Sequence, residues 1–422
     1  MQNNPSIAII GAGPAGLSAA DTLRRLGYGK VTVFEQAGRV GGKACSVATP
    51  AGVVEMGAVI ASAECELVLG LADRLRVPVA PYPVQQRFLD EHGARHDAMG
   101  FLASRYSPEQ IRQAIASYGA ALERFAVVGY DTLAGMPDAL QLPFDRFAAL
   151  HGFTPVAELA RGALIGFGYG YYETVPAVYF MKLLPWLFRP DGKGGLQPGA
   201  FYVFPQGFQG LWEALAGELE VRLNAGVTAL ERLPDGGVQL TIAGAGVQRF
   251  DAVIVAAPLH TVPRFMQLQP EEAALFAQLR SNRYLVSAFA ASGLATGEFL
   301  FLHENEHPDR IGHMNAWANR NPALPMYLGW QLAERRSGTE DLQRLLAADI
   351  AAQGGRLERV VLQQEWDYFP HVDGAALAGG YFEQLDAMQG AGNVYFAGGA
   401  LNFETVEHSA RQARALVRRH FG

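Results

Sequence analysis

Hydrophobic residues near the N-terminus gather in short runs that suit buried parallel strands. Ile7–Ile10 is wholly apolar and Val31–Phe34 nearly so, as expected where both faces of a strand are covered. Residues 15–26 between them are predicted to form a helix that Gly27 closes. The pattern therefore predicts a β–α–β unit, with a second helix over residues 64–75.

Strand-like runs return in the second half of the chain. Residues 227–233 and 238–242 predict a hairpin, and residues 250–258 predict a buried strand that ends in a turn of small residues. Residues 393–399 predict a further strand that enters a glycine turn, and an amphipathic helix follows to the C-terminus.

The middle of the chain, from about residue 89 to 196, has a different character. Ser107 and Gln110 flank a proline at the first helical position and predict a capping box, after which apolar residues follow at helical spacing. Another short helix is expected to begin at 142–145, ahead of a glycine- and aromatic-rich stretch at 162–172. We interpret the region as a helical insert with an aromatic-lined wall.

Three glycines after the first strand form a pattern that holds dinucleotides. Gly11 allows the tight turn, Gly13 lets backbone N–H groups approach a pyrophosphate, and Gly16 lets the helix pack closely on the strand. The helix N-terminus then presents partial positive charge to the phosphates. Glu35 closes the next apolar run about twenty residues later, where a carboxylate binds a ribose hydroxyl. The motif predicts a bound dinucleotide.

A second glycine turn contains Gly42, with Arg39 and Lys43 on either side. A nicotinamide-binding unit has no use for this turn, whereas a permanently held FAD needs a second loop over its pyrophosphate. The pattern resembles the FAD-binding oxidoreductases of the amine-oxidase type; a surface turn with two solvated cations is the other interpretation. The next turn contains Met56, Gly57 and Ala58 and suits a backbone that lies close to an isoalloxazine ring. This turn therefore favours FAD over a surface turn.

The same resemblance implies further cofactor contacts. In this class, the small-residue turn and the later glycine turn lie close to the cofactor, and the N-terminus of the C-terminal helix lies beneath the flavin. Its dipole would favour the negative charge of a reduced ring. The residues implied in this way are Ala15, Val227, Ala257, Gly398, Gly399 and Val406.

These elements predict an α/β fold with an α+β insert. A Rossmann-like FAD-binding domain is expected from residues 1–76, 197–262 and 388–422, which come from the first, middle and last parts of the chain. A mixed-sheet substrate domain is expected from residues 77–88 and 263–387, and the helical insert from residues 89–196.

Composition narrows the function classes for these 422 residues. A net charge of −7 without a basic stripe argues against nucleic acid as a partner. Cys45 and Cys65 are too few for a disulfide framework or a zinc site, and no other spacing indicates a metal. We find neither a signal peptide nor a stretch that could span a bilayer, so a cytoplasmic protein without stable membrane insertion is expected.

Later motifs make the resemblance more specific. From the N-terminal glycines almost to the C-terminus, the chain resembles the FAD-dependent polyenoic fatty acid isomerases. The resemblance implies a lipid substrate and a redox-neutral reaction: flavin N5 takes a hydride from the methylene between two double bonds and returns it to another carbon. The product would be a conjugated diene, and aromatic residues would suit the cationic intermediate. The matching motifs are residues 142–145, 167–170, 175–177, 368–372 and 395–398.

Two substrate-positioning residues follow from this resemblance. Phe167 matches the family aromatic beside the reacting diene, although core packing would account for it equally. The family binds the substrate carboxylate with an arginine just before a Phe-Leu pair. Here Arg87 precedes that pair, but a gap-free alignment puts Gln86 at the arginine's position. Either Arg87 takes the role after a one-residue slip, or the contact is absent and a carrier-bound or modified acyl chain is the substrate.

Two other functions stay open on the sequence. The FAD pattern also suits an oxidase or desaturase of amine-oxidase type, and the uncertain substrate contacts suit a flavin-binding protein without catalysis. Lys182 could approach the flavin, as lysines do in amine oxidases, but a helix-surface cation is the favoured interpretation. His371 is interpreted as a packed or hydrogen-bonded histidine rather than a base. Glu407 and His408 could face either the flavin or solvent, and the oligomeric state is undetermined.

Overall fold

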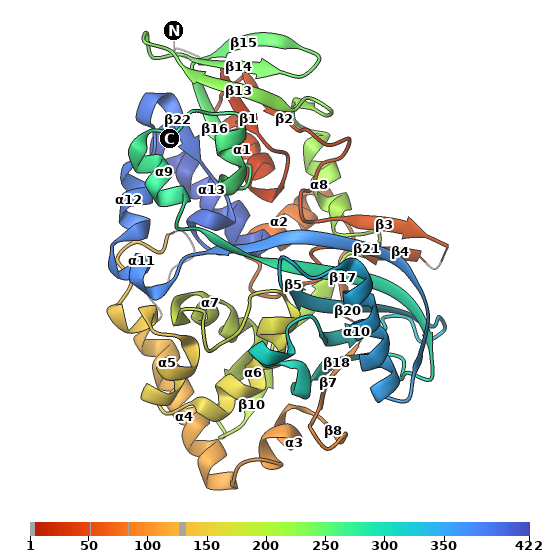
Figure 1. The fold of residues 1–422 in the computed structure, drawn as a ribbon. Helices are drawn as coiled ribbons and strands as arrows, with labels where there is room; N and C mark the ends of the chain where they lie inside the picture. Colours follow the sequence, from red (N-terminus) through yellow and green to blue (C-terminus); the bar gives the residue numbers. More distant parts are fainter. Residues whose placement is uncertain (1–4, 51, 83, 126–131) are drawn as a thin grey trace.

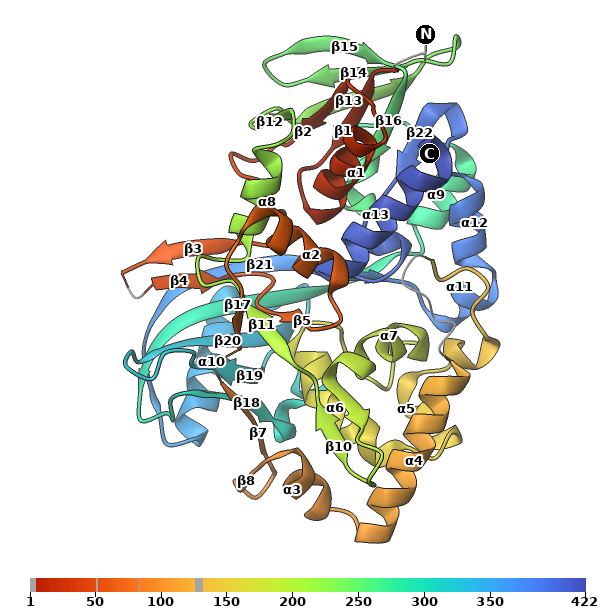
Figure 2. The same ribbon diagram turned by 180° about the vertical axis from the view of Figure 1, so that it is seen from behind.

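The computed structural model describes residues 5–50, 52–82, 84–125 and 132–422. In Figure 1 a parallel sheet and its helices occupy the upper part of the molecule, and a second, mixed sheet lies below with a group of helices beside it. Figure 2 shows the same division from behind. Both upper and lower parts draw on segments far apart in the sequence.

The parallel sheet is built on the predicted N-terminal unit. Its strand order is β12-β2-β1-β16-β22, and every neighbouring pair is parallel. The central strands β1 and β16 are buried along their whole length, which explains their unbroken apolar runs. Helices α1 (Pro14–Arg25) and α13 (Val406–Phe421) pack against each other. The strands are β1 (Ile7–Ile10), β2 (Val31–Phe34), β12 (Val221–Arg222), β16 (Ala252–Val255) and β22 (Val394–Phe396).

An antiparallel sheet of β13 (Val227–Arg232), β14 (Val238–Ile242) and β15 (Gly246–Phe250) lies at the top of Figure 1. It contains the predicted hairpin. The strand predicted over residues 250–258 was wrong in its bounds, because Phe250 ends β15 and the buried strand β16 runs from Ala252 to Val255. Asp251 separates them, and its carboxylate accepts hydrogen bonds from the backbone N–H and hydroxyl of Ser6 at 2.7 and 2.8 Å.

The mixed sheet has the order β21-β17-β20-β19-β18-β7-β8. Neighbouring strands are antiparallel except β18 and β7, which are parallel. Helix α10 (Thr339–Ala352) covers one face over a small core that includes Phe289, Trp317 and Tyr327. The other face belongs to the main core. The strands are β7 (Gln85–Leu89), β8 (Arg95–His96), β17 (Arg280–Ser292), β18 (Glu298–Leu302), β19 (Met314–Ala318), β20 (Met326–Ala333) and β21 (Arg356–His371).

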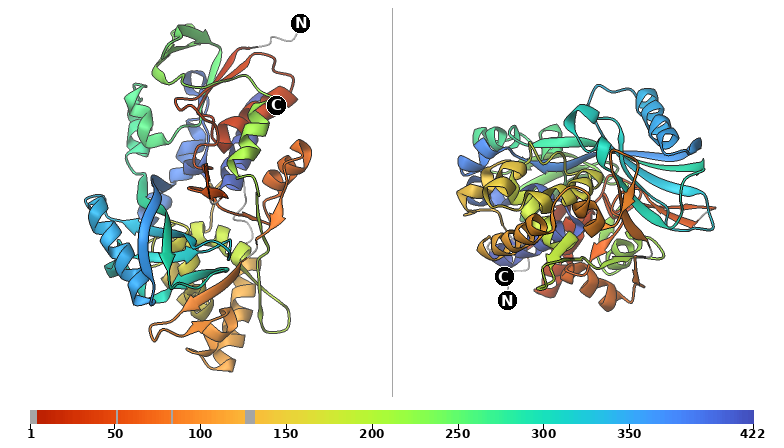
Figure 3. Two further views of the ribbon diagram at one scale, coloured as in Figure 1. Left: turned by 90° about the vertical axis from the view of Figure 1, so that its right-hand side faces the viewer. Right: turned by 90° about the horizontal axis from the view of Figure 1, so that it is seen from below.

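Helices from the middle of the chain lie beside the mixed sheet, as the left view of Figure 3 shows. They are α3 (Ala98–Ala103), α4 (Pro108–Arg124), α5 (Phe144–Leu150), α6 (Thr154–Gly166) and α7 (Ala177–Leu187). The capping box before α4 is confirmed: Ser107 Oγ accepts from the Gln110 N–H, and Gln110 Oε1 accepts from the Ser107 N–H. This region is not wholly helical, because it also contains β8 and a hairpin of β9 (Phe188–Pro190) and β10 (Leu196–Pro198).

The second helix predicted from the sequence is α2 (Glu66–Leu75), which starts two residues later than expected. Among the described residues, no helix is long and apolar enough to cross a membrane. The other elements are β3 (Ser46–Thr49), β4 (Gly52–Glu55), β5 (Ala61–Ser62), β6 (Ala80–Pro81), β11 (Phe201–Val203), α8 (Gln209–Ala216), α9 (Pro270–Phe276), α11 (Gly374–Ala378) and α12 (Tyr381–Ala387).

Candidate active site

The turn between β1 and α1 has the geometry that its glycines predict. Gly11 has a φ of +106°, and a Cβ there would lie 3.1 Å from the carbonyl oxygen of Ala256. A Cβ on Gly16 would lie 1.9 Å from the carbonyl oxygen of Gly11, so only glycine lets α1 pack this closely. No side chain caps the N-terminus of α1, and its first turn holds no acidic residue. The turn therefore presents free N–H groups and partial positive charge to an anion.

Glu35 is tied to this turn. Its Oε2 accepts from the Ala12 N–H at 2.8 Å and its Oε1 from the Ala37 N–H at 2.9 Å. A carboxylate oxygen has further lone pairs, so each can still accept a hydroxyl donor. Two backbone N–H groups thus hold the carboxylate in one orientation beside the glycine turn, as a ribose-binding residue requires.

The second glycine turn lies directly against the first. The Gly41 N–H donates to the carbonyl oxygen of Ala12 at 2.9 Å, and a Cβ on Gly42 would lie 3.2 Å from the Cα of Gly13. Arg39 donates to the carbonyl oxygen of Gly42 at 2.8 Å and so closes the turn from within. Side chains at these glycines would fill the space between the turns, which therefore form one cradle of the shape that the sequence predicts for a pyrophosphate.

Three further predicted contact regions converge on this cradle. Ala257 follows β16, and its backbone nitrogen lies 3.4 Å from the Cβ position of Gly11. A Cβ on Gly398 would lie 3.7 Å from the Cβ of Ala15, while the Gly398 N–H donates to Gln412 Oε1 at 2.9 Å. Val227 begins β13, just after Ala225, whose N–H donates to the carbonyl oxygen of Glu35 at 2.8 Å.

A largely apolar cavity lies between the parallel and mixed sheets. Lys43, Gly57, Ala58 and Val406 line it on the side of the parallel sheet, together with Thr405, which caps α13 by accepting from the His408 N–H at 3.0 Å. A Cβ on Gly57 would lie 1.9 Å from the carbonyl oxygen of Lys43, so these two loops touch. The aromatic residues that line the cavity are Phe167, Tyr169, Trp186, Phe201, Phe208, Tyr284, Phe299, Trp330, Trp366 and Tyr368.

Met56 and Gly399, two of the predicted cofactor-binding residues, are not among the residues that line the cavity. Met56 is 2% exposed, and its carbonyl oxygen accepts from Trp366 Nε1 at 2.7 Å. Gly399 packs against Glu404, whose Cα would lie 3.0 Å from an added Cβ. Both residues are therefore packed within loops beside the cavity.

Phe167 lines the cavity from the end of α6. Its ring packs edge-on against Phe299 with 6.2 Å between centroids, and Phe299 stacks on Trp330 at 5.0 Å. Gly168 follows with a φ of +86°, where a Cβ would lie 2.7 Å from the ring of Tyr368. This turn lets the chain leave the helix without displacing Tyr368 and directs Phe167 to the cavity.

The hydroxyl groups of three tyrosines that line the cavity form hydrogen bonds within the protein. Tyr284 donates to the carbonyl oxygen of Gly166 at 2.6 Å. Tyr169 donates to the carbonyl oxygen of Glu404 at 3.2 Å, and Tyr368 contacts the Tyr169 hydroxyl at 3.4 Å. Burial raises the pKa of each phenol well above 10, so all three stay neutral. They offer aromatic rings to a ligand and no base.

The charged side chains Lys43 and Glu407 at the cavity also have partners within the protein. Lys43 Nζ lies 2.5 Å from Glu404 Oε1 and 5.3 Å from the centre of the Tyr368 ring. The Glu407 carboxylate accepts from the N–H groups of Leu67 and Val68 at 2.9 and 2.8 Å, at the start of α2. Glu407 therefore joins α13 to α2 and is also among the residues that line the cavity.

The strand register places Arg87 on the face of the mixed sheet away from the cavity. Arg87 lies opposite Leu300, whose side chain belongs to the core under α10, and Arg87 Nη2 donates to Gln85 Oε1 at 2.7 Å. Gln86 lies opposite Phe299, which lines the cavity. Because neighbouring residues of a strand face opposite sides, Gln86 takes the cavity face and Arg87 the other.

Lys182 and His408 lie inside the protein. Lys182, expected on a helix surface, is only 6% exposed on α7, which is buried along most of its length. His408 stacks on Trp186 at 5.0 Å, and its Nδ1 lies 2.7 Å from Thr405 Oγ1. His371 is a packed histidine as expected, since its ring stacks on Phe369 at 4.6 Å and its Nδ1 lies 2.8 Å from that residue's carbonyl oxygen.

His408 predicts a pH dependence of stability. Burial, with the positive charges of Lys182 and Arg411, holds its pKa well below the usual 6.5. The unfolded chain therefore binds a proton below about pH 6.5 that the folded chain does not, so stability is lost as the pH falls. Replacing His408→Gln should reduce the drop in unfolding free energy between pH 7 and pH 5 by up to about 2 kcal/mol.

Urea unfolding at several pH values measures this change. His92→Gln is the matched control, because the His92 side chain is 82% exposed, and it should leave the slope unchanged. The His408→Gln variant also loses the contact with Trp186, so the slope against pH, rather than the stability itself, is the readout. An unchanged slope would contradict the assignment.

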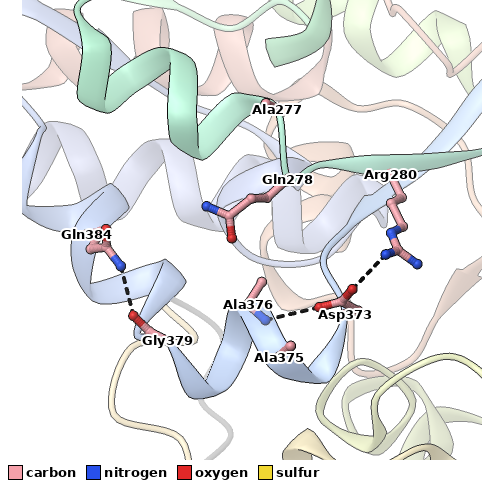
Figure 4. Close-up of a pocket in the computed structure, with 8 residues that line it drawn as sticks. All are labelled: Ala277, Gln278, Arg280, Asp373, Ala375, Ala376, Gly379 and Gln384. Carbon is pink, nitrogen blue, oxygen red and sulfur yellow. Dashed lines mark hydrogen bonds and ion pairs between the residues drawn. The ribbon is translucent and has the colours of Figure 1, made fainter.

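A separate surface pocket, between the end of α9 and α11, offers no comparable chemistry (Figure 4). Arg280 pairs with Asp373 at 2.7 Å, and Asp373 also accepts from the Ala376 N–H at 3.0 Å, while Gln384 donates to the carbonyl oxygen of Gly379 at 2.8 Å. The charged groups drawn there are thus bonded to one another. Among the described residues, no group of three or more potential ligands gathers around a metal position.

Comparison with known proteins agrees with this site. The family model of flavin-containing amine oxidoreductases matches residues 14–419, so the chain belongs to that family. The glycine cradle, the uncapped N-terminus of α1 and the oriented Glu35 fit the FAD expected from the sequence, and FAD is its cofactor.

Individual relatives confirm the more specific resemblance. The chain is 24% identical to a polyenoic fatty acid isomerase of Ptilota filicina, over 99% of this chain and 95% of that one. It superposes on the crystal structure of a CLA-producing fatty acid isomerase from P. acnes with a TM-score of 0.89 and 26% identity, over all of both chains. A putrescine oxidase bound to putrescine shares the fold, with a TM-score of 0.73 and 17% identity over 98% of both chains.

Proposed function

We propose that this chain, with bound FAD, isomerises double bonds of polyunsaturated fatty acids or related acyl chains. The observation that carries the proposal is an aromatic-lined cavity that meets the flavin cradle at Lys43, Gly57, Ala58 and Val406. The near full-length similarity to two fatty acid isomerases supports the substrate class. Gly11, Gly13, Gly16, Glu35 and Gly42 would hold the dinucleotide part of the cofactor.

When bound, FAD supplies an N5 atom that can accept a hydride from a bis-allylic methylene and return it to another carbon. The protein's own residues would hold the diene, exclude water and stabilise positive charge on the substrate. Phe167, Trp330 and Tyr368 are suited to this role because aromatic faces attract cations and apolar rings displace water. The N-terminus of α13, at Val406, would stabilise negative charge on the flavin side.

Proton transfer has little support at the cavity. Lys43 is paired with Glu404, two backbone N–H groups bind Glu407, and the three engaged tyrosines keep their protons. A hydride mechanism needs no general base, so this arrangement favours it over acid–base isomerisation. The N-terminal arrangement is shared with amine oxidases, so a net oxidase or desaturase is the alternative that the experiment must exclude.

Anaerobic incubation with linoleic acid, without NAD(P)H, tests the proposal. The yellow holoprotein is expected to produce conjugated-diene absorbance over many turnovers, because the flavin returns to its starting state in each cycle. A deuterium label at the bis-allylic carbon should stay within the product. Hydrogen peroxide formed in air in proportion to substrate loss would indicate an oxidase, and washout of deuterium would indicate acid–base chemistry.

A further inference from the structure

An arginine close to the cavity is left without a partner. Arg320 follows β19, is partly buried, and forms no hydrogen bond or ion pair with any residue that the structure describes. A guanidinium keeps its charge at all physiological pH values, so partial burial without a counter-ion is unfavourable. An anionic ligand would remove this cost.

Strand register places Arg320 on the cavity side of the mixed sheet. Phe299, which lines the cavity, pairs with Gln86 on one side and with Ala318 on the other. The Asn319 N–H donates to the carbonyl oxygen of Glu298 at 3.0 Å, so this pairing continues one residue beyond β19. Arg320 lies in the bend two residues after Ala318, and the alternation of the strand, continued to this position, places it on the face shared by Phe299 and Gln86.

A buried hydroxyl without a partner lies in the same region. Tyr82 follows β6, and its N–H donates at 2.8 Å to the carbonyl oxygen of Phe201, another residue of the cavity. The Tyr82 hydroxyl is buried and has no hydrogen-bond partner among the described residues. Such orphaned groups are rare in folded proteins and call for an explanation. Burial raises the pKa of Tyr82 while Arg320 opposes that rise, so the two groups lie within electrostatic reach.

Glu55 lies within electrostatic reach of Arg320, but its carboxylate oxygens bind other groups. Its Oε2 accepts from Ser46 Oγ at 2.6 Å, and its Oε1 accepts from the Phe208 N–H at 2.8 Å. Burial raises the pKa of this carboxyl, and the positive charge of Arg320 opposes that rise. No ion pair or hydrogen bond joins the two side chains in the part of the chain that the structure describes. The guanidinium therefore keeps its donors for another group.

We propose that Arg320 and the Tyr82 hydroxyl bind the free carboxylate of the acyl substrate. This inference rests on the proposed function and narrows its substrate to an unesterified acid. Gln86 holds the position at which the family resemblance expects an arginine, and it cannot supply a charge. Arg320 supplies that charge from the bend after β19, which pairs with the other side of β18, so the carboxylate contact has moved across the sheet. Its planar fork can bind two carboxylate oxygens while the phenol donates a third hydrogen bond.

Binding of non-reacting ligands tests the inference without turnover. Octadecanoic acid and octadecanol are titrated against the FAD-loaded protein, and the change in flavin absorbance gives each Kd. Arg320→Gln should weaken acid binding about tenfold to a hundredfold, because it removes a charge-assisted contact, and should change alcohol binding less than about twofold. Tyr82→Phe should weaken acid binding about threefold to tenfold.

Arg87→Gln is the matched control, since this neighbouring arginine lies on the opposite face of the sheet; it should leave both Kd values unchanged. Adding Gln86→Arg to the Arg320→Gln variant should restore acid binding, because the charge returns to the same face. If Arg320→Gln does not hold FAD, Arg320→Lys keeps the charge without the fork and should lose a smaller part of the acid affinity.

Equal losses for acid and alcohol, or no loss for either, would overturn the carboxylate assignment. The two proposals fail separately. A wild-type protein that forms no conjugated diene from any polyunsaturated acid refutes the proposed function. A wild-type protein that forms the diene, but whose Arg320→Gln variant binds the acid normally, refutes only this inference.

Discussion

Replacing Gly16 with alanine is expected to give a protein that cannot retain FAD. The added Cβ would lie 1.9 Å from the carbonyl oxygen of Gly11 and 3.1 Å from its carbon. Both atoms belong to the backbone of the phosphate-binding turn, so no side-chain rotation relieves the overlap. Either α1 moves off β1 or the turn opens, and in both cases the N–H groups no longer converge on a pyrophosphate.

The expected loss of FAD affinity is at least about a hundredfold, or about 2.7 kcal/mol. Visible absorbance of the purified protein and titration of the apoprotein with FAD measure it. Gly70→Ala is the matched control, because Gly70 lies inside α2 and a Cβ there meets no atom within 4 Å. That variant should bind FAD normally and be more stable by about 0.5–1 kcal/mol. Normal FAD content in Gly16→Ala would show that the turn does not hold the cofactor.

Truncation of Phe167 should have the second largest effect. This ring lines the cavity, and its contact with Phe299 links it to the stacked Trp330. Phe167→Ala would remove one wall from the position proposed for the diene, and a displacement of the reacting carbon by about 1 Å can lower a rate about a hundredfold. We therefore expect kcat for linoleic acid to fall about a hundredfold while the flavin spectrum and FAD content stay as in the wild type.

Phe289→Leu serves as the control for this prediction. Phe289 belongs to the same mixed sheet but packs in the small core under α10, on the face away from the cavity. Its replacement should cost stability, typically about 1 kcal/mol or more, and leave kcat near the wild-type value. A similar fall of kcat in both variants would mean that Phe167 acts through general packing, the alternative considered from the sequence.

Local sequence patterns were sufficient wherever one short segment makes its own structure. The β–α–β unit, the capping box before α4 and the hairpin of β13 and β14 depend on nearby residues, and the structure contains them. The bounds of β16 were less predictable, because only Asp251 interrupts the apolar run. The Asp251 carboxylate accepts a hydrogen bond from Ser6, and this residue separates the end of β15 from the start of β16.

Several site features could not be found from local patterns. Trp330 and Phe299 lie on different strands of the mixed sheet, and each resembles an ordinary core residue in sequence. A partial signal existed on β21, where Trp366 and Tyr368 occupy alternate positions and so share one face. The burial of Lys182 was equally hidden, since a single cation in an apolar helix usually marks its exposed side.

The cofactor class could be predicted from the amino-acid sequence alone, because phosphate binding depends on glycines and an acidic residue at close spacing in one turn–helix unit. Which side chains face the cavity depends instead on how distant strands pair. Adjacent residues of a strand face opposite sides, so a shift of one position separates Gln86 from Arg87 by the thickness of a sheet. Arg320 comes within electrostatic reach of Tyr82 through pairings between distant segments, which no single stretch of sequence encodes.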